Sequence, residues 1–338
     1  MNFRRRELML ITASFLVGCA TPITSSDQAN EIFDIYDDAF LKLLDVSQDF
    51  DVLGGGFGWS EGPAWDRNLN KLYFTDVPGN VAYQWSESTG VEEFLNPSGS
   101  SVTEGFREPG ANGLLFTHNR NLLICNHGER AVQRMDLATK ERENLAQTYQ
   151  GKKFNSPNDV IVDDSENIYF TDPPYGLEGL DQSPLKQLDF NGVFRLNKTG
   201  GVEPLIKDMT FPNGVALSAD QRTLYITQSD PEAPHLYALD LARPGSKKSL
   251  LVDFSSYMKD GSPGLPDGMV VDQMGNIFVT GPGGVFVISP RGKVLGRINT
   301  GKGSANCTFG GDGSILFITN HDRLIKLKTK TRGLAWKS

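Results

Sequence analysis

Six side chains that could each offer an oxygen ligand recur at matching positions along this 338-residue chain. Each follows a small or turn-forming residue and precedes an apolar run, and successive copies are roughly 40 to 55 residues apart, a spacing typical of repeat folds. They are two carboxylates and four carboxamides: Glu61, Asn112, Asn158, Asn213, Asp267 and Asn306. Hard cations such as Ca²⁺ take about six to eight oxygens of these kinds. The pattern therefore indicates a cation site, provided that the fold brings these residues together.

The repeat unit predicts the elements that must position these side chains. Two clear copies are SPNDVIVDDSENIYFTD from Ser156 and LPDGMVVDQMGNIFVTG from Leu265. Each copy holds two β-type runs around a turn rich in Asp, Asn and Gly, and two more runs follow in most copies. Four strands repeated six times predict an all-β fold, a six-bladed β-propeller. Because the first strand of each blade lines the central channel, we expect the six polar side chains to converge at its mouth.

Two plainer interpretations of the six positions stay open. An Asn-Gly or Asp-Gly pair is by itself a turn signal, so any single position could be a turn residue. The complete set could also be a polar plug of the tunnel without a metal. Six copies in register, with carboxylates at Glu61 and Asp267, favour the cation site over both.

The last repeat predicts how the ring closes. After Asn306 the chain offers only three β-type runs, NCTFGG, SILFITN and RLIKLKTK. We therefore expect the fourth strand of this blade to come from before the first repeat, with DFDVLG at residues 49–54 as the candidate. A propeller closed by an N-terminal strand avoids the exposed sheet edges of an open array.

Residues 49–338 are predicted to form the propeller, and the first 48 residues to lie outside it. Residues 1–18 have the features of a signal peptide, with three arginines before an apolar stretch too short to span a bilayer. The stretch ends in LVGC, which resembles the lipobox of bacterial lipoproteins and implies acylation of Cys19; an ordinary secretory signal is the alternative. This predicts a periplasmic lipoprotein anchored to the outer membrane through lipidated Cys19. Residues 19–48 are expected to be a tether with a short amphipathic helix at 31–44.

Composition excludes some partners and limits others. The formal net charge of −8 and the pI near 5.1 argue against nucleic acid, because proteins that bind it carry a basic patch. Cys125 and Cys307 lie in apolar β-type runs of distant repeats, so we expect buried free thiols rather than a disulfide or a zinc site. We expect a small-molecule ligand and a monomer or dimer.

Over residues 50–328 the chain resembles the gluconolactonase/regucalcin-like lactonase family, and most closely its bacterial gluconolactonase branch. The resemblance rests on SEGPAW, SPNDVIVD, FTDPPYG, FPNGVALS and LPDGMVVD, in that order. It implies a six-bladed propeller with a divalent cation in the channel, usually Ca²⁺, with Zn²⁺, Mg²⁺ or Mn²⁺ as alternatives. The motifs imply four metal ligands, Glu61, Asn158, Asn213 and Asp267.

The same resemblance implies hydrolysis of the ester of a sugar lactone. Such an enzyme must polarise a carbonyl, supply a nucleophile and stabilise an oxyanion, and a cation with open positions can do the first and the last. Asp267 is the predicted catalytic residue, as general base on water or, alternatively, as nucleophile. Asn112 and His127 are predicted to bind substrate.

Further residues around the expected mouth are weaker candidates. His321, Arg107 and Tyr175 could shape the pocket or be ordinary surface residues. Asn126 and Thr117 stand where the bacterial branch leads us to expect Glu and Asp, which leaves substrate details open. Two other functions also stay open. They are hydrolysis of an organophosphate or phosphoester at the same metal, and a non-catalytic ligand-binding propeller with a structural Ca²⁺.

Overall fold

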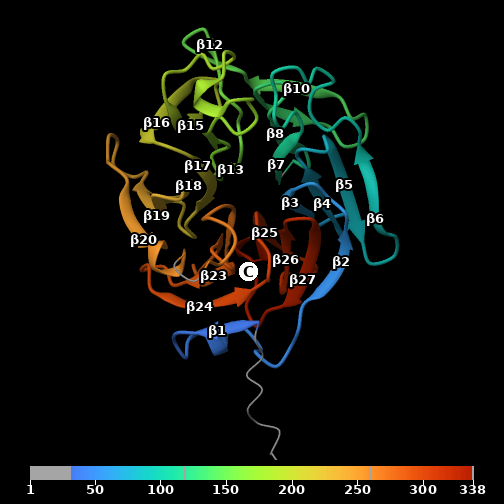
Figure 1. The fold of residues 1–338 in the computed structure, drawn as a ribbon, viewed down its shortest axis with the longest axis vertical. Coiled ribbons are helices and arrows are strands. Elements are labelled where there is room, and N and C mark those ends of the chain that lie inside the picture. The colour runs from blue at the N-terminus through green and yellow to red at the C-terminus, as the bar shows by residue number, and fades with distance from the viewer. Residues whose placement is uncertain (1–31, 118, 259–260, 337–338) are drawn as a thin grey trace, which may run out of the picture.

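The computed structural model describes residues 32–117, 119–258 and 261–336, and these form a ring of antiparallel sheets around a central axis (Figure 1). Six sheets follow one another around the ring in chain order, which confirms the predicted all-β, six-bladed propeller. The predicted signal peptide, Cys19 and most of the predicted tether lie outside the described residues. Among the described residues, no helix is long and apolar enough to cross a membrane.

Each blade begins beside the axis and adds its strands outward, so the first strands of neighbouring blades contact one another around the channel. Blade 1 contains β3 (Ser60–Asp66), β4 (Lys71–Asp76), β5 (Val81–Ser86) and β6 (Gly90–Leu95). Blade 2 contains β7 (Ala111–Phe116), β8 (Leu122–Asn126), β9 (Ala131–Met135) and β10 (Arg142–Ala146). Blade 3 contains β13 (Val160–Val162), β14 (Ile168–Asp172), β15 (Asn191–Leu196) and β16 (Val202–Met209). Blade 4 contains β17 (Pro212–Leu217), β18 (Thr223–Asp230), β19 (Ala233–Asp240) and β20 (Ser249–Asp253). Blade 5 contains β21 (Met269–Val271), β22 (Ile277–Gly281), β23 (Gly284–Ile288) and β24 (Val294–Asn299). Blade 6 contains β25 (Asn306–Gly310), β26 (Ile315–Asn320) and β27 (Arg323–Lys328). The connections hold a small hairpin, β11 (Thr148–Tyr149) with β12 (Lys152–Lys153), and the 3-10 turns η2 (Leu180–Gln182), η3 (Ser255–Met258) and η4 (Leu334–Trp336).

Apolar side chains from adjacent blades fill the wedges between them. Between blades 2 and 3, Phe154, Phe170 and Phe194 are fully buried, and the last two rings stack 5.4 Å apart. Cys125 lies in the same cluster and Cys307 in the cluster between blades 5 and 6; both are buried free thiols, as predicted. Full burial of each phenylalanine contributes about 1.5–3 kcal/mol. These wedges hold the blades at fixed positions around the channel.

The ring closes where the two ends of the chain meet. β2 (Asp51–Gly55) pairs antiparallel with β27, which confirms the predicted N-terminal closing strand. Figure 1 shows this strand, in blue, beside the red strands of the last blade. Blades 6 and 1 are also joined near the axis, because the Ser60 N–H donates to the His321 carbonyl (2.7 Å) and the Ser60 hydroxyl to the Arg323 carbonyl (3.1 Å).

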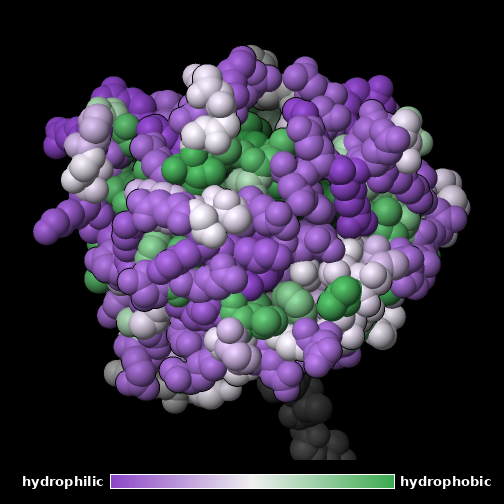
Figure 2. All heavy atoms as spheres, turned by 90° about the horizontal axis from the view of Figure 1, so that it is seen from above, coloured by the Kyte–Doolittle hydropathy of each residue, from purple (hydrophilic) through white to green (hydrophobic). Residues whose placement is uncertain are grey.

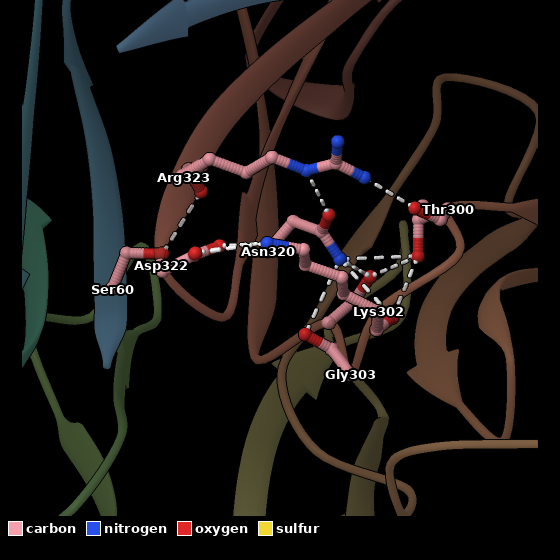
Figure 3. A network of polar contacts seen from close by, with 8 residues as sticks. Ser60, Thr300, Lys302, Gly303, Asn320, Asp322 and Arg323 are labelled. Atoms are coloured by element: carbon pink, nitrogen blue, oxygen red, sulfur yellow. Dashed lines mark hydrogen bonds and ion pairs between the residues drawn. The ribbon is translucent and has the colours of Figure 1, made fainter. Parts of the chain in front are cut away.

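A polar network around Asn320 supports this closure (Figure 3). The Asn320 amide nitrogen donates to the Thr300 hydroxyl (3.1 Å) and to the Lys302 carbonyl (3.1 Å). Its carbonyl oxygen accepts a hydrogen bond from the Arg323 guanidinium (2.7 Å). Since Ser60 is bonded to the turn that carries Arg323, the network also fixes the start of β3 at the channel mouth.

The predicted helix at residues 31–44 is wrong. Residues 32–44, its described part, contain β1 (Phe33–Ile35) and the 3-10 turn η1 (Phe40–Lys42) instead. β1 adds a fifth strand to the outer edge of blade 5, where Asp34 forms an ion pair with Arg297 (2.7 Å). Phe40 is completely buried there, so pairing with the edge of β24 overrides the helical periodicity. Among the described residues, the folded unit thus includes β1, which lies before the predicted boundary at residue 49.

The face shown in Figure 2 is mainly hydrophilic, with groups of apolar side chains among the polar ones. The most exposed large apolar residues, Val52, Val102 and Met274, come from different parts of the chain. Scattered apolar groups of this kind are usual on protein surfaces. The residues that could do chemistry gather instead at the channel.

Candidate active site

The six predicted oxygen-bearing residues lie at the starts of the innermost strands or immediately before them. Less than a tenth of the surface is exposed in five of them, Glu61, Asn112, Asn158, Asn213 and Asn306. Asp267 is partly exposed, but its Oδ1 atom is buried and has no hydrogen-bond partner among the described residues.

A chain of hydrogen bonds joins the amide side chains around the ring. Asn112 Nδ2 donates to Asn158 Oδ1 (2.8 Å), and Asn158 Nδ2 donates to Asn213 Oδ1 (2.6 Å). Asn213 Nδ2 in turn donates to the Ser229 hydroxyl (2.9 Å), which donates to the Pro266 carbonyl (2.5 Å). This relay brings three of the predicted residues together and orients their oxygen atoms in one direction around the channel.

The carboxyl groups at the ring act on one another electrostatically. The pKa of Glu61 is raised to about 8, first by burial and then by the charges of Asp159 and Glu108. Burial also raises the pKa of Asp267 well above its usual value, and the charge of Glu61 adds to this shift. Asp159, the residue after Asn158, is buried beside them, and burial raises its pKa to about 6. A bound cation would offset this crowding of like charges.

Glycines let the innermost strands approach this closely. A Cβ atom on Gly214 would lie 2.3 Å from the Asp267 carbonyl oxygen, and one on Gly268 would lie 1.9 Å from the Asn306 amide carbon. A Cβ atom on Gly62 would lie 2.1 Å from the backbone of the next blade. The Asn-Gly and Asp-Gly pairs are thus places where one blade packs directly on its neighbour.

Buried threonines on the second strands of the blades form hydrogen bonds with the backbone of the ring. The Thr227 hydroxyl donates to the Asp267 carbonyl (2.7 Å) and accepts from the Gly214 N–H (2.7 Å). The equivalent hydroxyl of Thr171 donates to the carbonyl of Asn213 (2.6 Å). Five blades have this threonine, fully buried: Thr75, Thr171, Thr227, Thr280 and Thr319. These contacts fix the backbone from which the candidate ligands project.

Two paired loops form a wall beside the ring. The backbone N–H groups of Arg107 and Glu108 both donate to the Gly176 carbonyl (3.0 and 3.3 Å). A Cβ atom on Gly176 would lie 2.7 Å from the Cβ of His127, so the glycine allows the loop to pack on this imidazole. His127 is completely buried. Neither its ring nitrogens nor the Tyr175 hydroxyl has a hydrogen-bond partner among the described residues.

The charge state of His127 follows from its burial. Burial lowers the pKa of His127 to about 4, although the side chain of Asn158 beside it acts in the opposite direction. The imidazole is therefore neutral at pH 7, with one nitrogen able to donate and the other to accept a hydrogen bond. Buried polar atoms normally have partners, and a polar molecule in the mouth would supply them to His127, Tyr175 and Asp267.

The side chains of three other predicted residues, His321, Thr117 and Asn126, make their described contacts outside the ring. His321 is exposed, and its ring lies edge-on against Trp59 with the ring centres 5.2 Å apart. Thr117 lies at the turn between β7 and β8, where its hydroxyl bonds within the turn. Asn126 donates to Gln133 inside blade 2 (2.9 Å). The two departures from the bacterial pattern therefore act in the scaffold of blade 2.

Three residues of the site were not predicted from the sequence. Glu108 lies in the connection between blades 1 and 2, outside the repeated strand–turn–strand pattern. Asp159 occupies the position that is glycine in four other repeats, a difference that could have identified it. Ser229 ends the amide relay and follows no motif of its own.

The chemistry of the candidate ligand set suits a hard cation. The described residues contain no cluster of three or more His, Cys, Asp or Glu side chains placed to bind a metal ion. The predicted set differs from such a cluster, because it combines the carboxylates Glu61 and Asp267 with the carboxamides Asn158 and Asn213. The unpaired, buried Oδ1 of Asp267 fits a cation ligand. An all-oxygen set suits Ca²⁺ or Mg²⁺ better than Zn²⁺, which favours nitrogen and sulfur.

Comparison with known proteins identifies the family. The model of the SMP-30/Gluconolactonase/LRE-like region matches residues 59–322. The chain belongs to this family. This match confirms the family resemblance that we inferred from the sequence motifs.

Individual relatives agree with this assignment. A gluconolactonase of Zymomonas mobilis is 41% identical over 299 residues, which cover 86% of this chain and 84% of that one. The structure of XC5397, a gluconolactonase of Xanthomonas campestris, matches with a TM-score of 0.73 at 29% identity, over 88% of this chain and 94% of the other. The calcium-binding regucalcin of Agrobacterium tumefaciens shares the fold, with a TM-score of 0.66 at 18% identity over 84% and 95% of the two chains.

Proposed function

We propose that this SMP-30/gluconolactonase family member hydrolyses the ester of a sugar lactone with the help of a divalent cation, Ca²⁺ in the first instance. The observation that carries the proposal is the oxygen-rich ring in which the buried Asp267 Oδ1 has no hydrogen-bond partner among the described residues. The 41% identity to a gluconolactonase supports the choice of reaction. The cation would be held by Glu61, Asn158, Asn213 and Asp267.

The reaction assigns a role to each part of the ring. When bound, the cation would polarise the lactone carbonyl and stabilise the charge of the oxyanion. Asp267 would take a proton from the attacking water and return it to the alkoxide released by ring opening; direct attack by its carboxylate is the alternative. Thr227 would maintain Asp267 in position through its hydrogen bond to the Asp267 carbonyl.

Asn112 and His127 would contact the substrate. Asn112 is already oriented by its hydrogen bond to Asn158 (2.8 Å), so its carbonyl oxygen would accept from a substrate hydroxyl. The neutral His127 imidazole would donate to one hydroxyl and accept from another, which would satisfy its two unpaired nitrogens. Burial of both side chains would limit competition from bulk water.

A substrate panel tests the proposal against the two other functions. The purified protein would be treated with a chelator, and hydrolysis of D-glucono-1,5-lactone, other sugar lactones and organophosphate triesters would be measured before and after Ca²⁺ is restored. We expect lactone hydrolysis that is lost on chelation and recovered with Ca²⁺. Turnover of organophosphates alone would support phosphoester hydrolysis at the same site. A tightly held cation without turnover of either class would support a binding propeller.

A further inference from the structure

Glu108 is a carboxylate at the channel mouth that lies outside the candidate ligand set. Its side chain is only 14% exposed, although it projects from the loop that connects blade 1 to blade 2. Its one described charged partner is the Arg107 guanidinium, 2.8 Å away, and Arg107 itself is largely exposed. A carboxylate that is mostly buried needs several donors to compensate for the water it loses.

The loop that carries Glu108 is held in place on both sides. The Glu178 N–H donates to the Gly105 carbonyl (3.0 Å), and Phe106 forms a β-bridge with Leu177. Closer to the ring, the Glu108 N–H donates to the Gly176 carbonyl. The carboxylate therefore stands on a fixed wall, as a residue that recognises a ligand must.

Backbone contacts place Glu108 beside the ring, because its N–H donates to the Gly176 carbonyl and Gly176 packs against the His127 side chain. In agreement with this position, its negative charge contributes to the raised pKa of Glu61 and of Asp267. Glu108 thus lies on the same wall as His127 and Tyr175, whose ring nitrogens and hydroxyl have no hydrogen-bond partner among the described residues. The wall offers one charged acceptor next to neutral groups that can donate.

This combination suits a molecule with several neighbouring hydroxyl groups. A carboxylate accepts hydrogen bonds through two oxygens and can hold two adjacent hydroxyls at once, and such charge-assisted bonds are stronger than neutral ones. A site built to bond a hydroxyl also rejects an analogue that lacks it, because its polar groups are then left unpaired.

We propose that Glu108, positioned by Arg107, binds the hydroxyl groups of the lactone and makes the enzyme selective for polyhydroxylated lactones. This inference rests on the proposed lactonase function and adds a specificity residue to it. Asp267 and the candidate metal ligands retain their roles, and Glu108 contributes to substrate binding alone.

Two lactones and one matched control test the proposal. The value of kcat/KM would be measured for D-glucono-1,5-lactone and for δ-valerolactone, which has the same ring without hydroxyls. We expect Glu108→Ala to lower kcat/KM on gluconolactone about 100-fold and to change that on δ-valerolactone less than about threefold. Glu104→Ala, an exposed glutamate in the same loop, should change neither. Glu108→Gln retains the shape and serves the same test should the alanine variant fail to fold.

Each contrary result has a separate meaning. An equal loss on both lactones, or a weaker Ca²⁺ affinity by calorimetry, would show that Glu108 acts on the metal or on the fold and would overturn the inference. Unchanged turnover of both lactones would overturn it as well. These outcomes leave the proposed function intact, since they require an active wild type. A wild type that hydrolyses neither lactone would refute both.

Discussion

Gly214→Ala tests whether close contact between blades 4 and 5 positions the catalytic carboxylate. The new Cβ atom would lie 2.3 Å from the Asp267 carbonyl oxygen and 2.7 Å from the Gly268 Cα. Ordinary carbon–oxygen contacts are about 3.3 Å or longer, so the two backbones must separate by about 1 Å. Both atoms belong to the main chain, and a change of side-chain rotamer cannot relieve the contact.

The displacement gives two expected magnitudes. Overpacking of this kind costs about 1–3 kcal/mol, and we expect about 2–3 kcal/mol because backbone rather than side chain must move. A shift of about 1 Å at a reacting group can lower turnover about 100-fold. Urea unfolding and a lactone assay with saturating Ca²⁺ would measure the two effects. Gly55→Ala is the control, because its Cβ would meet only ordinary contacts at 3.4 Å or more. A Gly214→Ala variant as stable and active as Gly55→Ala would refute the argument.

Two further predictions concern the support of Asp267 and the charge of the ring. Thr227→Val keeps the shape but leaves the Gly214 N–H and the Asp267 carbonyl without their partner, so we expect a loss of about 1–3 kcal/mol in urea unfolding; Thr227→Ser should retain most of the stability, and equal losses in both variants would contradict this role of the hydroxyl. The pKa of Glu61 is raised from its usual 4.5 to about 8, so the native state holds this proton more tightly than the unfolded state. The chelated protein should therefore lose stability as pH rises from about 4.5 to 8, and the gain in Tm from Ca²⁺ should be larger at pH 8 than at pH 5; an equal gain at both values would argue against a cation beside Glu61.

Local repetition explains why the fold and the ring were predictable. The strand–turn–strand pattern recurs in six copies, so the register of Asn158 and Asp267 follows from sequence alone. The closing strand β2 was predictable for the same reason, since the last repeat lacks one strand.

Contacts between distant segments explain what was missed. The helical pattern at residues 31–44 gives no sign that β24 offers an unpaired edge, and β1 forms because that edge is available. Glu108 reaches the mouth because its loop is bonded to Gly176, almost 70 residues further along the chain. His127 and His321 end the similar motifs ICNH and ITNH. His321 is nevertheless exposed against Trp59, whereas His127 is buried at the mouth. The repeat does not predict how these loops pair, because the loops lie outside the repeated unit.

The rate of lactone hydrolysis by Asp267→Asn tests the central claim most directly. The substitution keeps an oxygen atom for a cation and removes the proton acceptor, and Asp189→Asn is an exposed control. With Ca²⁺ saturating and thermal unfolding unchanged, we predict that kcat falls by about 1,000-fold in Asp267→Asn and stays at the wild-type value in the control. An Asp267→Asn enzyme that turns over within a few-fold of wild type would contradict the account.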